Sequence, residues 1–382
     1  MVTPRIVFDA RCLRGAPGGV ATYAAALVHH LPKLAPNIEF VFLRHPDARA
    51  PLSTDPNVTE WSLGGDPNDP ISYLRVGPWL RRRLRPDDLF HAPYRILPLG
   101  APPQSVITIH DVMQIVCPEL VFPNPFVRTL LAPYWGMAIR SSLHRAGRII
   151  AVSNHSRDDA ARLIPSCKDR IRVTYLAAEP VFTRPDDEVA LENTRELVPA
   201  GMRFFLVLGG GYPNKNHAAA VLAFAAAFSS ADDVHLVIIQ RERTFSKEVE
   251  IALRETGLAD RVHVRSKISM EALVGLYARA EALVFPSLYE GFGLPVLEAM
   301  SCGCPVVCST LTSVPEVAGD AALLCDPRDL DALAKALRRV ANDAPLRLDL
   351  RARGLLRARQ FRWEQTAKQT LDTYRELVPS LP

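Results

Sequence analysis

The chain has 382 residues, of which 48% are hydrophobic and 23% charged. Since a domain usually holds ~100 to 200 residues, this length predicts two domains, and the composition excludes a disordered chain. The formal net charge of +4 is small and the basic residues are dispersed, which argues against a nucleic-acid-binding protein.

The N-terminus and the apolar runs point to the cytoplasm. The opening MVTPRIVFDARCLRG has one short apolar run followed at once by Asp9 and Arg11, so it lacks the features of a secretory signal. No stretch approaches the ~18 apolar residues that a membrane-spanning helix needs. The seven cysteines fit reduced thiols, and Cys302, Cys304 and Cys308 are expected to be buried structural residues rather than metal ligands.

In the first half, short apolar runs alternate with longer amphipathic segments. The expected strands are RIVFDA, EFVFL, DLFHA, SVITI and RIIAVS, and a Gly-rich turn leads into the expected helix GGVATYAAALVHHL. This alternation predicts crossover units and a mostly parallel sheet covered on both faces.

The tract SYLRVGPWLRRRLRP allows two interpretations. Its apolar residues and its arginines, Arg75 to Arg85, could lie on an anionic membrane surface. The alternative, which we favour because Gly77 and Pro78 interrupt the helix, is a solvated helix face before an edge strand.

The second half repeats the pattern of the first. Its expected strands are RFFLVLG, VHLVII, RVHV, ALVFPS, CPVVCS and AALL, separated by helices such as HAAAVLAFAAAF and MEALVGLYARA. The fold class is therefore α/β with two Rossmann-like domains, one over residues 1–185 and one over residues 198–360, joined by the charged segment 179–197. Residues 361–382 are expected to form a helix that returns to the first domain.

The window VFPSLYEGFGLPVLEAMSCGCPVV carries the most chemical information. Its strand ends near Phe285, Pro295 suits the first turn of a helix, and Gly303 ends that helix. Gly291 and Gly293 then lie just before a helix N-terminus and beyond the carboxyl end of a strand, where a phosphate is favoured.

Two carboxylates frame this glycine loop, Glu290 before it and Glu298 in the helix. Because a carboxylate repels a phosphate, the expected partners of both are sugar or ribose hydroxyls. The alternative for Glu298 is a helix residue that the positive end of the helix dipole stabilises.

The run EGFGLPVLE resembles the E-x7-E signature of the retaining glycosyltransferases of family four, and SVPEVAGDAALLCDP resembles the next segment of that family. The resemblance implies the GT-B fold, two Rossmann-like domains with an interdomain cleft. It places Glu290 by the donor sugar and Glu298 on the ribose, and gives Glu316 no defined role. Backbone N–H groups for the donor would come from Gly291, Phe292, Gly293 and Leu294.

Other windows resemble the same family in chain order. GAPGGVATY is similar to its first glycine loop, in which Gly18 and Gly19 would let the backbone approach the ligand. VITIHDV is similar to a histidine motif whose His110 would reach the donor sugar; the alternative is a histidine that caps a strand end. LGGGYPNKNH, with Gly210, Asn214 and Lys215, corresponds to the diphosphate-binding loop, and FRWEQTAKQTLDTY to the closing helix.

Two departures from the family pattern concern the donor. The family often has Arg-Lys-Asn where this chain has Asn214, Lys215 and Asn216, so Lys215 must carry more of the diphosphate charge or Arg241 or Arg265 must replace the missing cation. Arg265 also stands where the family usually has a glycine in a loop that commonly touches the base, which leaves the base undecided.

The resemblance implies transfer of a hexose from a nucleoside-diphosphate sugar, GDP- or UDP-linked, to a hydroxyl acceptor with retention. His110, Lys215 and Glu290 are the expected catalytic residues, and no metal is expected because no DxD run is evident. The opening RIVFDARCL with GGVATY most resembles bacterial members that build polysaccharides or glycolipids, which favours GDP-mannose. The acceptor, glycan, lipid-linked or small molecule, stays open, as does contact with the inner face of the membrane.

Other functions fit the sequence less well. A nicotinamide-dependent dehydrogenase lacks support because GGGYPNKN is not G-x-G-x-x-G, and a P-loop enzyme lacks the G-K-[ST] motif. A catalytically silent nucleotide-sugar-binding protein and an epimerase or phosphorylase of the same fold remain alternatives.

Overall fold

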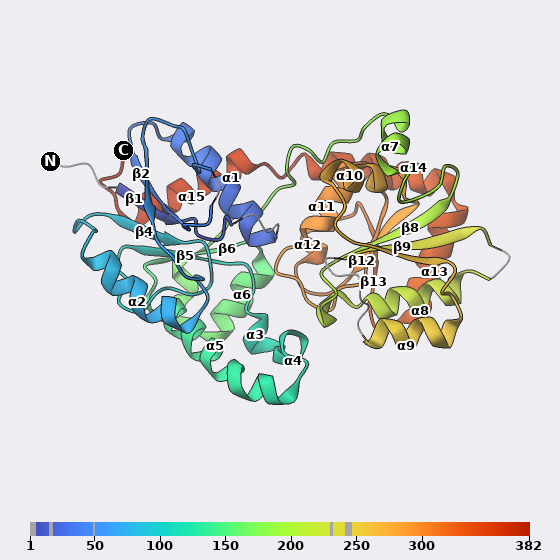
Figure 1. The fold of residues 1–382 in the computed structure, drawn as a ribbon, viewed down its shortest axis with the longest axis horizontal. Coiled ribbons are helices and arrows are strands. Elements are labelled where there is room, and N and C mark those ends of the chain that lie inside the picture. The colour runs from blue at the N-terminus through green and yellow to red at the C-terminus, as the bar shows by residue number, and fades with distance from the viewer. Residues whose placement is uncertain (1–4, 15–17, 49, 230–231, 241–246) are drawn as a thin grey trace. The chain divides into compact units, whose positions relative to one another are not determined.

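The computed structural model describes residues 5–14, 18–48, 50–229, 232–240 and 247–382, and Arg241 lies outside them. The chain divides into two compact units (Figure 1). Unit 1 comprises Met1–Leu176 and Arg362–Pro382, and unit 2 comprises Ala177–Phe361.

Unit 1 is built on a seven-stranded sheet in the order β3-β2-β1-β4-β5-β6-β7. All its strand pairs are parallel, as the sequence predicted. The strands are β1 (Arg5–Asp9), β2 (Glu39–Arg44), β3 (Val58–Ser62), β4 (Leu89–Ala92), β5 (Ser105–Ile109), β6 (Arg148–Ala151) and β7 (Ile171–Val173). β1, β4 and β5 are buried along their whole length, as expected of parallel strands covered on both faces.

Helices cover both faces of this sheet. They are α1 (Gly19–Leu34), α2 (Pro70–Arg81), α3 (Met113–Val116), α4 (Pro118–Val121), α5 (Pro125–Arg145), α6 (Asn154–Leu163), a 3₁₀ turn (Pro165–Arg170) and α15 (Trp363–Leu377). Asp69 caps α2 by accepting a hydrogen bond from the backbone N–H of Ser72 at 2.7 Å.

Two expectations about the arginine-rich tract are wrong. α2 runs without a break through Gly77 and Pro78. Gly77 lets the helix approach the backbone of Leu99, whose N–H donates to the carbonyl of Tyr73 at 2.7 Å. A Cβ on Gly77 would lie 1.9 Å from the Leu99 carbonyl oxygen. The next strand, β4, is not an edge strand but lies between β1 and β5.

Unit 2 repeats the architecture with a six-stranded parallel sheet in the order β10-β9-β8-β11-β12-β13. The strands are β8 (Arg203–Leu208), β9 (Val234–Ile239), β10 (Val262–Arg265), β11 (Ala282–Phe285), β12 (Val306–Ser309) and β13 (Leu323–Cys325). The helices are α7 (Asp187–Thr194), a 3₁₀ turn (Pro213–Lys215), α8 (His217–Ala227), α9 (Lys247–Thr256), α10 (Met270–Arg279), α11 (Leu294–Ser301), α12 (Val314–Ala318), α13 (Leu330–Asn342) and α14 (Ala344–Ala358).

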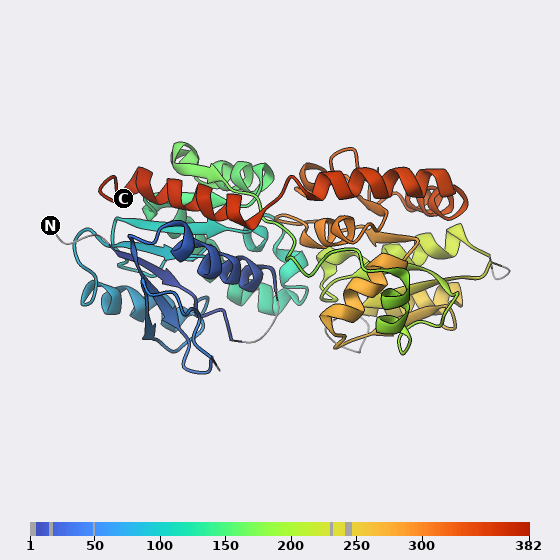
Figure 2. The same cartoon turned by 90° about the horizontal axis from the view of Figure 1, so that it is seen from above.

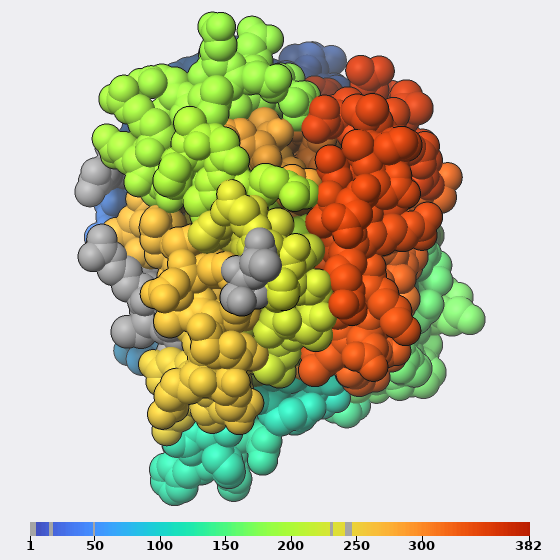
Figure 3. Space-filling model, turned by 90° about the vertical axis from the view of Figure 1, so that its right-hand side faces the viewer, coloured from blue at the N-terminus to red at the C-terminus, as the bar shows by residue number. Residues whose placement is uncertain are grey.

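One core of unit 2 lies between its sheet and the packed pair α8 and α13. Phe205 of β8 packs against Phe224 and Phe228, with ring centroids 6.5 and 5.6 Å apart. Figure 3 shows an outer face of this unit, on which the red segments of its C-terminal helices lie beside yellow segments of its earlier ones.

α15 belongs to unit 1 although the chain reaches it after leaving unit 2. It packs against α1, which Figure 2 shows as the red and dark blue helices lying along each other. Its Tyr374 hydroxyl lies 2.6 Å from Nδ1 of the buried His91, whose Nε2 lies 2.8 Å from the hydroxyl of Thr108. A polar network in the core therefore fixes this helix to β4 and β5. In the described residues, no helix is long and apolar enough to cross a membrane.

Candidate active site

In both units the strand order reverses beside the first strand, between β1 and β4 in unit 1 and between β8 and β11 in unit 2. The loops that follow two such strands leave the sheet in opposite directions, and ligands of open α/β sheets bind at the opening between them. In unit 2 these loops are residues 209–216, after β8, and residues 286–293, after β11.

Lys215 and Glu290 meet at this position in unit 2. Nζ of Lys215 donates a hydrogen bond to Oε1 of Glu290 at 2.6 Å, and the side chains are 18% and 11% exposed. The ammonium group also lies 5.4 Å from the centre of the Phe285 ring, at the end of β11. A cation and a carboxylate that retain little solvent are thus held at the carboxyl edge of the sheet.

The two asparagines beside Lys215 tie the two loops together. The Asn214 side-chain amide donates to the carbonyl of Tyr289 at 3.0 Å, and the Asn214 carbonyl accepts from the N–H of Leu288 at 2.8 Å. Asn216, in the left-handed conformation with φ 54°, donates to the carbonyls of Pro286 and Pro327. The side chain of Asn214, predicted to bind the donor, is therefore committed to the neighbouring loop.

A loop after β12 holds the segment that contains Glu290. The hydroxyl of Ser313 donates to the carbonyls of Glu290 and Phe292, both at 2.9 Å, and the hydroxyl of Thr312 accepts from the N–H of Glu290 at 3.1 Å. Gly293 caps α11 with φ 107°, a conformation that favours glycine. In the first turn of α11, which begins at Leu294, Pro295 has no N–H and the N–H of Val296 donates to the Gly293 carbonyl at 3.0 Å. The positive end of the α11 dipole therefore lies beside Glu290 in sequence.

Glu298 lies in α11, where Oε2 accepts a hydrogen bond from the Tyr277 hydroxyl at 3.0 Å. Burial raises the pKa of Glu298 to about 7, while the Tyr277 hydrogen bond acts in the opposite direction. With its pKa near neutral pH, this carboxyl group can be shifted toward the ionised form by a ligand hydroxyl that donates to it.

The glycine loop after β8 packs closely on the residues that follow it. A Cβ on Gly209 would lie 2.9 Å from both Cγ of Lys215 and Nε2 of His217, and one on Gly210 would lie 2.9 Å from the Tyr212 ring. His217, the first residue of α8, is buried, and burial followed by the nearby Lys215 lowers its pKa to about 4. A neutral imidazole therefore lies beside Lys215.

Arg265, predicted to contact the donor, lies at the end of β10 and is hydrogen-bonded to backbone carbonyls. Its guanidinium donates to the carbonyls of Val264 and Leu197 at 3.1 and 3.3 Å. It lines a cavity of about 580 Å³ with His235 and His263, whose Nδ1 and Nε2 atoms lie 3.0 Å apart. The structure does not show Arg265 in contact with Lys215 or Glu290.

His110 directly follows β5 in unit 1. Its Nε2 lies 3.2 Å from the carbonyl of Pro93, which can only accept, so Nε2 carries the proton and Nδ1 is the acceptor of the neutral ring. Burial, followed by Arg95, lowers the pKa of His110 to about 4. The Tyr23 ring packs edge-on against it with centroids 5.2 Å apart, and the Tyr23 hydroxyl lies 2.9 Å from that of Thr108.

Gly18 and Gly19 begin α1 in the same unit. Gly18 is exposed and extended with φ 174°, and a Cβ there would meet no atom within 4 Å. The fold itself therefore gives no reason for a glycine at position 18, and the space beside it is open to a ligand.

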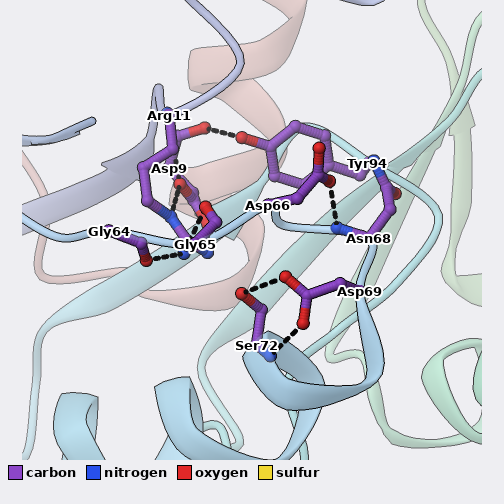
Figure 4. Close-up of polar contacts among 9 residues, drawn as sticks. All are labelled: Asp9, Arg11, Gly64, Gly65, Asp66, Asn68, Asp69, Ser72 and Tyr94. Carbon is purple, nitrogen blue, oxygen red and sulfur yellow. Dashed lines mark hydrogen bonds and ion pairs between the residues drawn. The ribbon is translucent and has the colours of Figure 1, made fainter. Parts of the chain in front are cut away.

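A buried ion pair organises the carboxyl edge of unit 1 (Figure 4). Arg11 donates to both carboxylate oxygens of Asp9 at 2.8 and 2.7 Å, and to the carbonyls of Gly64 and Gly65 at 3.1 and 3.4 Å. The Tyr94 hydroxyl donates to the backbone carbonyl of Asp9 at 2.6 Å. The loops after β1, β3 and β4 are thereby joined at the point where the strand order reverses.

Sequence reasoning missed several residues that shape these loops: Arg11, Tyr94, His217, Tyr277, Thr312 and Ser313. Asp9 and Arg11 were noted only as charges after an apolar run, and the hydroxyl residues carry no periodic signal. In the described ranges no group of three or more His, Cys, Asp or Glu residues is arranged to hold a metal ion. Cys302, Cys304 and Cys308 are free thiols in the core, and burial raises the pKa of each.

Known families and proteins match most of the chain. Residues 17–180 match the model described as Glycosyltransferase Family 4, and residues 192–357 match Glycosyl transferases group 1. The O-antigen chain mannosyltransferase B of Escherichia coli is 34% identical over 80% of this chain and 79% of that protein. The serotype-specific mannosyltransferase WbdA of Escherichia coli is 25% identical over 74% of this chain, but only over 34% of its own length.

The fold also matches solved structures. Sucrose-phosphate synthase from Thermosynechococcus elongatus superposes with a TM-score of 0.77 at 20% identity, over 99% of this chain and 100% of that chain. At this identity the likeness shows the fold, which is the predicted GT-B architecture of two Rossmann-like units.

Proposed function

We propose that this chain, which belongs to glycosyltransferase family four, transfers mannose from GDP-mannose to a hydroxyl of a growing glycan with retention at the anomeric carbon. As a member of this family the chain is a glycosyltransferase and uses a nucleotide-sugar donor. The observation that carries the site assignment is the contact between Lys215 and Glu290 at 2.6 Å, where the strand order of unit 2 reverses.

In this proposal unit 2 binds the donor. Lys215 and the positive N-terminal end of α11 stabilise the negative charge that grows on the diphosphate as the sugar leaves. Glu290, freed from Lys215 by the phosphates, accepts hydrogen bonds from sugar hydroxyls, and Glu298 accepts them from the ribose. Cation and helix N-terminus supply the stabilisation that a metal ion gives in other transferases, so we propose a metal-independent reaction.

His110 has a positioning role in this proposal. Because Nε2 is bound to the Pro93 carbonyl, Nδ1 is the atom that accepts a sugar hydroxyl. With a pKa of about 4 the ring is neutral at pH 7, so it orients the sugar without adding a charge.

The anomeric configuration is retained if the acceptor oxygen attacks the sugar on the same face from which the phosphate departs. The acceptor oxygen bonds to the anomeric carbon while the bond from that carbon to the phosphate oxygen breaks, and the departing phosphate oxygen takes the acceptor proton. This arrangement needs no enzymatic nucleophile. We propose mannose and a polysaccharide acceptor because the two Escherichia coli relatives named above are mannosyltransferases, one of them of the O-antigen chain. We also propose that the reaction takes place in the cytoplasm.

Nucleotide binding tests the donor assignment first. GDP in EDTA should raise the melting temperature of the protein more than UDP or ADP does, because a ligand of the folded state stabilises it by mass action. A shift with UDP alone would contradict the GDP assignment, and a shift that requires Mg²⁺ would contradict metal independence.

Transfer assays test the site itself. Lys215→Met and Glu290→Gln should each abolish transfer from GDP-[¹⁴C]mannose while the protein stays folded by circular dichroism. Glu281→Gln is the matched control, since Glu281 is also a largely buried carboxylate in an ion pair, with Arg203 at 2.8 Å. Normal transfer by both site variants would overturn the assignment, and an α-to-β change in the product, read by NMR, would overturn retention.

A further inference from the structure

α5 exposes a stripe of large apolar side chains to solvent. Phe126, Leu130 and Met137 are 79%, 68% and 57% exposed. Their spacing of four and then seven residues puts them on one face of the helix. The fully buried side chains of α5 begin only at Ala138, and before it Tyr134 and Trp135 pack partly buried against the core. Phe126 and Leu130 lie on the face of the helix that the core does not cover.

α2, in the same unit, also exposes large apolar side chains. Its Ile71 and Leu74 are 63% and 57% exposed, three residues apart on the outward side of the helix. α2 touches α5 through Tyr73, whose ring lies 6.3 Å from that of Tyr134 and whose hydroxyl donates to the Ser141 hydroxyl at 3.3 Å. Figure 1 shows the two helices along one border of unit 1. We call their exposed faces the α2–α5 surface.

The segments that carry the α2–α5 surface contain basic residues but no acidic ones. Residues 70–86 and residues 120–157 contain no aspartate or glutamate. Arg75, Arg82 and Arg128 make no side-chain hydrogen bond or ion pair that involves the described residues, so their guanidinium groups are available to a partner. A solvated helix face, the interpretation favoured from the sequence, accounts for these arginines but not for Phe126 and Leu130.

Unpartnered apolar side chains in a monomer mark an interaction site, and unpaired arginines around them select a partner with negative charge. An anionic lipid surface meets both requirements at once. Its phosphate groups bind the arginines, and its acyl region takes up the phenyl and isobutyl groups. A nucleic acid would leave the apolar stripe exposed.

We propose that unit 1 docks through the α2–α5 surface on a membrane that carries anionic lipids. The helices lie along the interface with Phe126 and Leu130 inserted between headgroups and Arg75 and Arg82 at the phosphate level. The inference goes beyond the transfer reaction and is tested without either substrate, so failure of one does not imply failure of the other.

The test is co-sedimentation of the full chain with vesicles of phosphatidylglycerol and phosphatidylcholine in equal parts. The wild-type protein should pellet with them, bind pure phosphatidylcholine vesicles far more weakly, and dissociate as salt is added. Phe126→Ser with Leu130→Ser should weaken binding roughly tenfold or more. Arg75→Ala with Arg82→Ala should weaken it roughly fivefold for each arginine, from about 1 kcal/mol per basic residue near the surface.

Matched controls keep the test specific. Leu356→Ser removes a 61% exposed leucine from α14, and Arg338→Ala removes an exposed arginine from α13, both in unit 2. These variants should bind like the wild type. The proposal is overturned if the wild-type protein does not pellet, if the control variants lose binding equally, or if both α2–α5 double variants bind normally. Circular dichroism on each variant separates lost binding from lost folding.

Discussion

Glu298 and His110 reach opposite pKa shifts through the same cause. Burial penalises the charged form of each, so the pKa of Glu298 rises to about 7 and that of His110 falls to about 4. At neutral pH the histidine is uncharged, whereas the glutamate is divided between two protonation states. A small change of surroundings, such as a bound hydroxyl, then decides the charge of Glu298.

Donor binding should therefore depend on pH through Glu298. A ribose hydroxyl donates to the ionised carboxylate, so the affinity for GDP should increase as pH rises through about 7 and then level off. Isothermal titration in buffers of different ionisation enthalpy should show proton release below that pH. Glu298→Gln should remove both effects, and a pH dependence that survives in this variant would assign it to another group.

The same residue should affect stability in the opposite direction. Its pKa is higher in the folded state, about 7, than the ordinary value of 4.5, so the folded state binds the proton more tightly between these values. The free energy of unfolding should therefore decrease as pH rises from about 4.5 to about 7, and less steeply in Glu298→Gln. Urea titrations across this range measure the difference, and equal slopes would contradict the burial of this carboxyl group.

At the scale of loops and helices, glycines of two kinds can be told apart. Gly293 has φ 107° at the start of α11, a conformation that costs a side-chain-bearing residue about 1–2 kcal/mol. Gly18 is extended and has open space beside it. The backbone conformation at position 293 therefore requires glycine, whereas the conformation and surroundings of position 18 do not.

Alanine at these two positions should give contrasting results. Gly293→Ala should lower the free energy of unfolding by about 1–2 kcal/mol and displace the loop of Glu290, with loss of transfer. Gly18→Ala should leave stability unchanged, so that any fall in activity reports contact with substrate. Denaturant curves measure the stability of both variants, and transfer assays measure their activity. If Gly293→Ala were as stable and active as the wild type, the left-handed conformation at the start of α11 would not require glycine.

The sequence was sufficient to predict the parallel sheets, the strand before Glu290 and the limits of α11, because Pro295 and Gly303 are local signals. β3 was missed because its residues are half exposed and give no apolar run. The contacts of Glu290 with Lys215 and Thr312 could not be predicted, since they join residues 75 and 22 positions apart through side chains without periodicity. The roles of His110, Lys215, Glu290 and Glu298 in catalysis stay predictions.

The buried pair of Asp9 and Arg11 is a further element that should not tolerate truncation. Arg11→Met leaves the Asp9 carboxylate buried without a partner and frees the loop at Gly64, so the free energy of unfolding should fall by about 3–5 kcal/mol. Arg14→Gln is the control, because its pair with Asp66 is partly exposed and should be worth less than about 1 kcal/mol. If both variants lowered the free energy of unfolding by similar amounts, the Asp9–Arg11 pair would not be what holds the carboxyl edge of the unit 1 sheet together.

Across the whole molecule, the polar network of α15 joins distant parts of the chain. Tyr374, His91 and Thr108 are all buried, and burial lowers the pKa of His91 to about 3, so the imidazole stays neutral and depends on hydrogen bonds to its neighbours. Loss of one hydroxyl leaves a polar atom without a partner in the core.

Removal of residues 362–382 should therefore affect the two units differently. Unit 1 should lose cooperative unfolding, because α1 and β6 lose the helix packed against them and His91 of β4 loses the Tyr374 hydroxyl. Unit 2 should keep its affinity for nucleotide. Calorimetry on the truncated chain, with and without GDP, measures both. A single sharp transition at the wild-type temperature would show that α15 contributes little.

The place of α15 also bears on how the chain folds during synthesis. Domains usually fold in the order in which they leave the ribosome, N-terminal first. Here residues 177–361 form a continuous unit that can fold as soon as it emerges, whereas unit 1 waits for residues 362–382. Unit 1, whose first segment is translated before unit 2, is thus completed after it. Until residues 362–382 emerge, the surface that α15 covers, including His91, is open to chaperones and proteases.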